Sequence, residues 1–200
     1  MCGITGIFDV YGKYPIRRET LAAMANALKH RGPDEKAYFI AGNVGLGFRR
    51  LSIIDVQNGH QPFFSDDGAV RLICNGEIYN HRELRGELQR KGYAFKTNCD
   101  VEVVLYLYLE YGTGFLHKLN GQFAFAISDS AKGLFFMARD PFGVCPLFYT
   151  LPQDVLIFGS EIKAILQHPL VRREVNLTGL DQTFSFPGLV SPATMFKGVY

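Results

Sequence analysis

Several short runs of this chain are apolar at almost every position, and this pattern restricts the fold more than any other feature. Phe123-Ala124-Phe125-Ala126-Ile127 is the clearest run, and residues 134–139, 147–150 and 155–159 are similar. A strand with one face in water alternates apolar and polar residues, whereas a strand buried on both faces does not. The sequence therefore predicts consecutive antiparallel strands in sheets that are covered on each side, by helices or by another sheet.

Helical spacing of apolar residues predicts three helices in the part of the chain that precedes these strands. One covers residues 19–30, one runs from Asn80 to Lys91, and one starts near Asp100. Asn80 and Glu83 have the spacing of a capping box, and Gly92 is a stop signal. Residues 67–68 read as the turn of a hairpin, and residues 70–75 as a buried strand.

Composition excludes several classes of protein. The net charge is +2 with Lys and Arg scattered along the chain, which argues against a nucleic-acid partner. No apolar run approaches the roughly 18 residues of a membrane span, and no signal peptide precedes the first strand. The cysteines and histidines lack zinc-ligand spacing, so we expect no metal site. The lack of an export signal points to a reducing compartment, so we expect a cytoplasmic protein without disulfides. Cys74 and Cys99 are interpreted as small core residues.

Cys2 is the strongest candidate for a nucleophile. If Met1 is removed, Cys2 carries both a thiol and a free α-amine, whose ordinary pKa is about 7.7–8.0. A neutral amine can then accept the thiol proton, directly or through a water molecule. Gly3 leaves room beside the thiol. The alternative is that Met1-Cys2-Gly3 is a chance sequence at a frayed terminus.

Six motifs in order resemble one family. They are Met1-Cys2-Gly3, His30-Arg31-Gly32-Pro33-Asp34, Arg50-Leu51-Ser52-Ile53-Ile54-Asp55, Asn75-Gly76-Glu77-Ile78-Tyr79-Asn80, Asp100-Val101-Glu102-Val103 and Arg139-Asp140-Pro141-Phe142-Gly143. Together they resemble the class II glutamine amidotransferases, which are N-terminal-nucleophile hydrolases, and most of all the glutaminase domain of glutamine-hydrolysing asparagine synthetases. The resemblance implies an α+β fold, a four-layer αββα sandwich of antiparallel sheets.

The resemblance also implies a catalytic site. Cys2 would attack the side-chain amide of L-glutamine, and the Asn75 side chain with the Gly76 main chain would bind the oxyanion. The alternative for Asn75-Gly76 is an ordinary tight turn after a strand.

A zwitterionic substrate needs one cation and one anion. Arg50 would bind the α-carboxylate, and Asp100 with Glu77 would accept from the α-ammonium. The alternatives are a surface ion pair for Arg50 and a helix N-cap for Asp100. In the family pattern, the main chain of four residues also lies along the substrate. These residues are Leu51, Ser52, Ile53 and Ile54.

The resemblance sets expectations for domains and partners. Residues 1–175 would form the type 2 glutamine amidotransferase domain, and residues 176–200 would lead to a synthetase domain that is absent here. That domain would receive ammonia and use ATP and magnesium, whereas glutamine hydrolysis needs no cofactor. The apolar ending at residues 196–200 would be exposed and would favour a homodimer. Two alternatives stay open: a class II amidotransferase with another ammonia acceptor, and a glutamine-sensing module without turnover.

Overall fold

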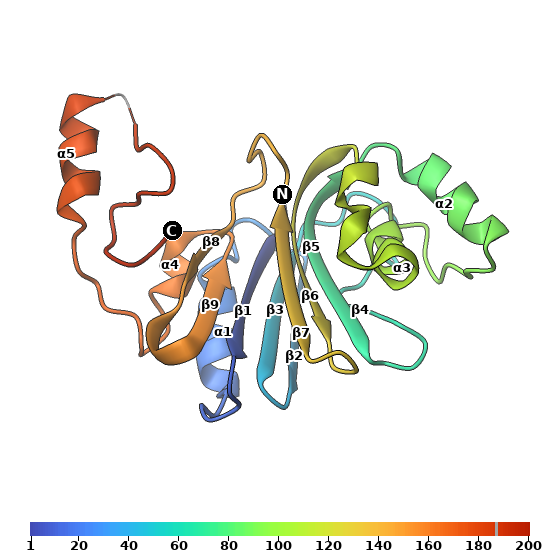
Figure 1. Ribbon diagram of the computed structural model, residues 1–200, viewed down its shortest axis with the longest axis horizontal. Helices are drawn as coiled ribbons and strands as arrows, with labels where there is room; N and C mark the ends of the chain where they lie inside the picture. The colour runs from blue at the N-terminus through green and yellow to red at the C-terminus, as the bar shows by residue number, and fades with distance from the viewer. Residues whose placement is uncertain (187) are drawn as a thin grey trace.

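Two antiparallel β-sheets lie face to face, with helices on their outer sides (Figure 1). The computed structural model describes residues 1–186 and 188–200. The first sheet has the strand order β2-β3-β1-β9-β8. Its strands are β1 (Gly3–Asp9), β2 (Glu35–Ala41), β3 (Val44–Arg50), β8 (Phe148–Thr150) and β9 (Val155–Gly159). The second sheet has the order β4-β5-β6-β7. Its strands are β4 (Phe63–Phe64), β5 (Val70–Ile78), β6 (Gly121–Asp129) and β7 (Leu134–Arg139).

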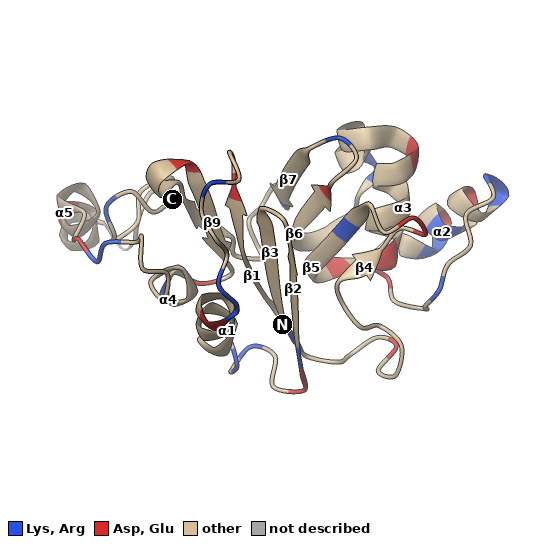
Figure 2. Cartoon of the chain, turned by 90° about the horizontal axis from the view of Figure 1, so that it is seen from below, with Lys and Arg blue, Asp and Glu red and all other residues tan. Residues whose placement is uncertain are grey.

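The helices complete the sandwich. Helices α1 and α4 contact the five-stranded sheet, and α3 contacts the four-stranded sheet with α2 beside it. The α-helices are α1 (Arg18–Asn26), α2 (His81–Arg90), α3 (Glu102–Tyr111), α4 (Ile162–Ile165) and α5 (Leu177–Ser185), and the 3₁₀ helices are η1 (Gly112–Lys118) and η2 (Pro152–Asp154). The predicted αββα sandwich is therefore confirmed. Charged residues lie mostly on the helices and loops around the two sheets (Figure 2).

Strand β6 shows why its sequence is apolar throughout. Phe123, Phe125 and Ile127 belong to the core beneath α2 and α3. Ala124 and Ala126 point the other way, into the core between the sheets. Successive side chains of a strand alternate between faces, so a central strand of this sandwich is buried on both. The prediction of covered sheets is confirmed at this strand.

Two details of the sequence reading are wrong. The strands between residues 121 and 159 do not form one antiparallel series, because β6 and β7 pair in one sheet whereas β8 and β9 pair in the other. The Asn80 side chain does not cap α2. It donates to the carbonyl of Lys118 and accepts from the N–H of Asn120, so it fastens the start of β6 instead.

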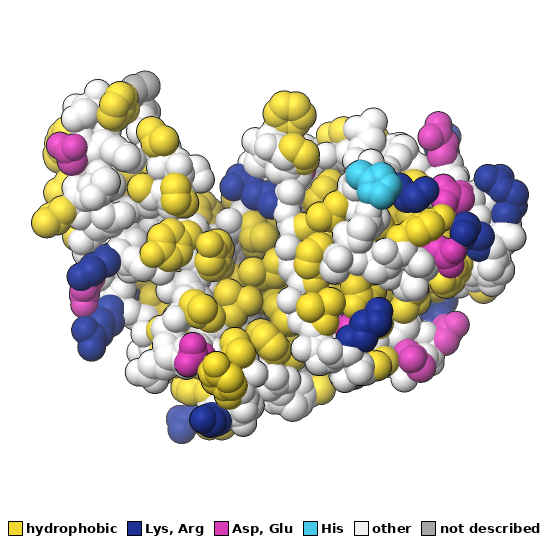
Figure 3. All heavy atoms as spheres, in the orientation of Figure 1, with side chains coloured by type: hydrophobic (Ala, Val, Ile, Leu, Met, Phe, Trp, Pro, Cys, Tyr) yellow, Lys and Arg dark blue, Asp and Glu magenta, His cyan; other side chains and the backbone are white. Residues whose placement is uncertain are grey.

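One residue near the end of the chain, Val199, is more buried than the sequence suggests, whereas Tyr200 is exposed. Val199 is 1% exposed, in the core formed by α1, α4 and the first sheet. The main chains of Tyr149 and Tyr200 exchange two hydrogen bonds. Exposed apolar side chains lie earlier, on and around α5, as Figure 3 shows at the same end of the molecule. The prediction of an exposed ending at residues 196–200 is therefore wrong for Val199. In the part of the chain that the structure describes, no helix combines the length and apolarity that a membrane crossing needs.

Candidate active site

Antiparallel pairing brings four distant segments to one edge of the sandwich. The start of β1 lies beside the end of β3, because Gly3 pairs with Arg49. The end of β5 and the start of α3 meet at Ile78, whose N–H donates to Asp100 Oδ2 at 2.8 Å. A cavity with about 580 Å³ of empty space, part of it open to solvent, lies between these segments. The predicted site residues that line this Cys2 cavity are Cys2, Arg50, Leu51, Ile53, Ile54, Asn75, Gly76, Glu77 and Asp100.

The Cys2 thiol is held by the main chain of Leu51. The Leu51 N–H donates to Sγ at 3.4 Å, and Sγ donates to the Leu51 carbonyl at 3.6 Å. Burial raises the pKa of the Cys2 thiol above its ordinary value, although the Leu51 hydrogen bond opposes this shift. A thiol in this state needs a base before it can act as a nucleophile at neutral pH. With Met1 attached, the nitrogen of Cys2 is a peptide amide and cannot serve as that base.

Asn75 presents a buried side-chain amide to the cavity. Its side chain is 0% exposed, and neither Nδ2 nor Oδ1 has a hydrogen-bond partner among the described residues. A buried amide without partners costs free energy, roughly 1–3 kcal/mol for each unsatisfied group. A structure keeps such a group where a ligand or an ordered water completes its hydrogen bonds. The amide is therefore available to a molecule in the Cys2 cavity.

The main-chain N–H of Gly76 points away from the neighbouring strand β6. Gly76 lies opposite Phe123 in the register of β5 and β6. However, the Phe123 N–H donates to Asp140 Oδ2 at 3.3 Å, and the Phe123 carbonyl accepts from the Asp140 N–H at 2.8 Å, both on the β7 side. Gly76 and Phe123 therefore form a pair without mutual hydrogen bonds. The Gly76 N–H faces the free edge of β5, which borders the cavity. Only glycine fits, because a Cβ atom here would lie 2.2 Å from the carbonyl oxygen of Gln122.

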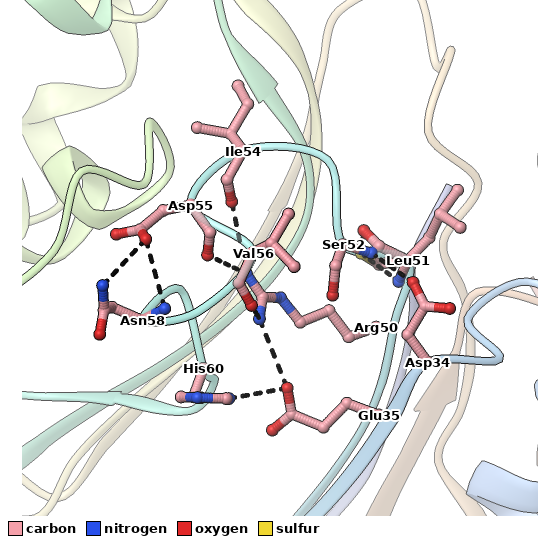
Figure 4. Close-up of polar contacts among 11 residues, drawn as sticks. Asp34, Glu35, Arg50, Leu51, Ser52, Ile54, Asp55, Val56, Asn58 and His60 are labelled. Carbon is pink, nitrogen blue, oxygen red and sulfur yellow. Dashed lines mark hydrogen bonds and ion pairs between the residues drawn. The ribbon is translucent and has the colours of Figure 1, made fainter.

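Arg50 is tied to the loop that follows it (Figure 4). Its guanidinium donates to the main-chain carbonyls of Ile54, Asp55 and Val56, at 3.3, 2.6 and 3.0 Å. It also lies 3.5 Å from the carboxylate of Glu35. The alternative of an exposed surface ion pair does not hold, because Arg50 is buried. The guanidinium both lines the cavity and shapes the loop over residues 51–56.

The predicted acceptors for an ammonium group differ in their surroundings. Asp100 is buried and accepts from the Ile78 N–H and, at 3.8 Å, from the Cys99 thiol. It is not the residue that begins α3, whose N-cap position is Val101. Glu77 also lines the cavity, but its carboxylate makes no hydrogen bond to another of the described residues. Ser52 lies outside the lining in the described part of the chain, and its N–H donates to Asp34 Oδ2 at 2.8 Å.

Gln61, Gln122 and Arg31 are polar residues at the site that were missed from the sequence. Gln61 is buried and lines the cavity. Arg31 donates from Nε to the main-chain carbonyl of Cys2 at 2.9 Å and pairs with Glu161 at 3.2 Å. Arg31 stands in a recognised motif, which could have drawn attention to it. Gln61 has no local signal, because its partners lie on β5.

Comparisons with known proteins agree on one family. A model of the glutamine amidotransferase domain matches residues 1–200. The protein called asparagine synthetase [glutamine-hydrolyzing] 2 of Bacillus subtilis is 45% identical over 180 residues, which cover 88% of this chain and 24% of that protein. Asparagine synthetase B [glutamine-hydrolyzing] of Escherichia coli is 39% identical over 167 residues, or 83% of this chain and 30% of that protein. The chain thus spans about a quarter to a third of the length of these relatives.

Solved structures support the fold. The structure titled as the allosteric regulatory enzyme of purine biosynthesis matches with a TM-score of 0.67 at 22% identity, over 83% of this chain and 43% of that one. The glutamine phosphoribosylpyrophosphate amidotransferase from Bacillus subtilis matches with a TM-score of 0.65 at 24% identity, over 82% and 43%. At these identities, the likeness concerns the fold alone.

Proposed function

Because this chain belongs to the glutamine amidotransferase domain family, we propose that it hydrolyses L-glutamine to L-glutamate and ammonia through a Cys2 thioester. One observation carries the proposal. The Asn75 amide is fully buried and without a partner among the described residues, and it lines the same cavity as the Cys2 thiol. A nucleophile and an oxyanion donor are two of the elements that acyl transfer from an amide requires, and the α-amine of Cys2 would be the third, the base.

The proposed reaction proceeds in two halves. After Met1 is removed, the Cys2 α-amine takes the thiol proton, and the sulfur attacks the side-chain carbonyl carbon of glutamine. The Asn75 Nδ2–H and the Gly76 N–H stabilise the oxyanion of the tetrahedral intermediate. Its collapse breaks the carbon–nitrogen bond, and the protonated amine returns its proton to the departing ammonia. Water then attacks the thioester, which releases glutamate and restores the thiol. These steps use only groups of the chain, the substrate and water.

The substrate is proposed to lie between opposite charges. The Arg50 guanidinium binds its α-carboxylate, and the Asp100 and Glu77 carboxylates accept from its α-ammonium. The support is that these three side chains line the same cavity as Cys2. The main chain of residues 51–54 follows the substrate, with Leu51 also holding the thiol.

The ammonia acceptor is proposed from the relatives. Those compared are asparagine synthetases, so we propose that a synthetase domain following residues 176–200 uses the ammonia with ATP, magnesium and aspartate. The phosphoribosylpyrophosphate amidotransferase shares the fold, which keeps a different acceptor as the second candidate.

A glutaminase assay tests the proposal. Purified protein, shown by intact mass to lack Met1, should release glutamate and ammonia in equal amounts from L-glutamine. A cysteine-directed glutamine analogue should abolish this release. Glutamine binding without any release would contradict the hydrolase and favour the glutamine-sensing module.

A further inference from the structure

Strand β4 pairs with only part of β5 and does not reach the end of β5 that carries Asn75 and Gly76. Along that end, side chains bind the main-chain groups of β5 that a longer β4 would bind. Phe63 of β4 pairs with Leu72. The next outward-facing main-chain groups of β5 belong to Cys74, and the Gln61 side chain binds both of them. Its Oε1 accepts from the Cys74 N–H at 2.6 Å, and its Nε2 donates to the Cys74 carbonyl at 3.0 Å.

The same edge continues past the proposed oxyanion donor. Cys74, Gly76 and Ile78 lie two residues apart, so their main-chain groups face the same way. The Gln61 side chain is hydrogen-bonded to the N–H and the carbonyl of Cys74, and the Asp100 carboxylate accepts from the N–H of Ile78. The N–H of Gly76 lies between these two anchors. The edge is therefore fixed on both sides of the group that faces the cavity.

We propose that Gln61 is a positioning residue, which extends β4 by one side chain and so holds the Asn75-Gly76 oxyanion donors in place. This inference rests on the proposed function. Only a carboxamide of this length both accepts and donates as a strand residue does. Gln61 is 6% exposed, so water cannot readily replace its two hydrogen bonds. Its loss would leave the main chain of Cys74 unpaired directly before Asn75.

A direct role in substrate binding is the competing explanation, because Gln61 also lines the cavity. The two roles predict different kinetics. A positioning residue acts on the transition state, so its removal lowers kcat and changes KM little. A side chain that binds the substrate equally in the ground state and in the transition state instead raises KM when it is removed.

The test compares Gln61→Ala with Ser65→Ala. Ser65 is a matched control because it is also buried and its hydroxyl accepts from a β5 main-chain N–H, that of Val70, at 2.9 Å. It lies at the turn end of the β4–β5 hairpin, far along the strand from Gly76. Gln61→Ala should lower kcat by on the order of 10- to 100-fold, the scale of a small misplacement of catalytic groups. Ser65→Ala should lose stability and keep its kcat.

Two further measurements sharpen the test. Gln61→Glu can both accept and donate only while its carboxyl is protonated. Its kcat relative to the original protein should therefore recover as the pH falls. Hydrogen exchange should quicken at the Cys74 amide, which loses its Gln61 acceptor, in Gln61→Ala and not in Ser65→Ala.

Three results would overturn the inference: an unchanged kcat in Gln61→Ala, a rise in KM alone, or equal kcat losses in the two variants. If the original protein released no ammonia from glutamine, the proposed function would fail by itself. The exchange measurement would then still decide whether Gln61 holds this edge.

Discussion

The guanidinium of Arg50 donates to the main-chain carbonyl of Asp55 at 2.6 Å, so one side chain both borders the Cys2 cavity and shapes the loop beside it. Asp55 is itself anchored, because its carboxylate accepts from the Asn98 N–H at 2.7 Å. The hydrogen bonds that this carboxylate accepts from Asn98 and from Asn58 hold the pKa of Asp55 below its ordinary value. The loop is therefore fixed from both ends, and substitutions at Arg50 affect the loop as well as the substrate.

Arg50→Ala should weaken glutamine recognition by about 2–5 kcal/mol, because the substrate carboxylate would lose its buried partner. A glutamine analogue without the α-carboxylate should lose little further activity, since this contact is already missing. Steady-state kinetics with both substrates measures the difference. Glu35→Ala is the control, because it removes the ion-pair partner of Arg50 outside the cavity. Equal losses for the two substrates would mean that Arg50 only maintains the loop.

Asp100→Asn should weaken recognition of the α-ammonium group on the same scale, about 2–5 kcal/mol. The amide can still accept from the Ile78 N–H, so the start of α3 should stay in place. An analogue without the α-amine should respond much less than glutamine in the same assay. If both substrates lost activity equally, Asp100 would serve the fold and not the substrate.

Asn75→Ala should lower kcat by roughly 10²–10³, or about 2.7–4 kcal/mol, the usual effect of losing one oxyanion donor. KM should change much less. The matched control is Asn80→Ala, which removes two side-chain hydrogen bonds outside the cavity and should lower stability without this loss of kcat. A near-normal kcat in folded Asn75→Ala would falsify the oxyanion role.

His168 should make the fold sensitive to acid. Burial lowers the pKa of His168 from 6.5 to about 4, because the protonated ring would be desolvated. The unfolded chain binds this proton below about pH 6.5 and the folded chain does not. Stability should therefore fall as the pH drops from about 6.5 to 4, by at most about 3 kcal/mol, and level off below.

The free energy of unfolding, measured by urea titration across this range, tests the histidine prediction. His168→Asn should remove the slope, since the amide can still accept from the Leu170 N–H. His117→Asn, at an exposed position, should keep it. An unchanged slope in His168→Asn would assign the acid sensitivity to other groups.

The sequence predicted the layers better than the connections between them. The continuous apolar run of β6 indicated burial on both faces, which is a local property of the strand. The separation of β7 from β8 depends on the turn after Asp140, whose carboxylate accepts from the N–H groups of Val144 and Cys145. Strand β2 was missed, because its mixed sequence from Glu35 to Ala41 carries a weaker pattern.

The candidate site was predicted from motifs, and the structure adds relations that motifs do not contain. Cys2 and Asn75 are far apart in the chain, and only the antiparallel topology brings them to one cavity. The orientation of the Gly76 N–H depends on which pairs of β5 and β6 exchange hydrogen bonds. The role of Gln61 depends on where β4 ends. Each of these relations is set by strand register, which no single motif encodes.

Trapping the acyl-enzyme tests the central claim most directly. Protein lacking Met1 should be mixed with glutamine, quenched in acid within one turnover, digested and examined by mass spectrometry. The account predicts a glutamyl adduct on Cys2, absent from Cys2→Ala and from a preparation that uniformly retains Met1. An adduct on Cys74, Cys99 or Cys145, or full turnover by the Met1-retaining protein, would contradict it.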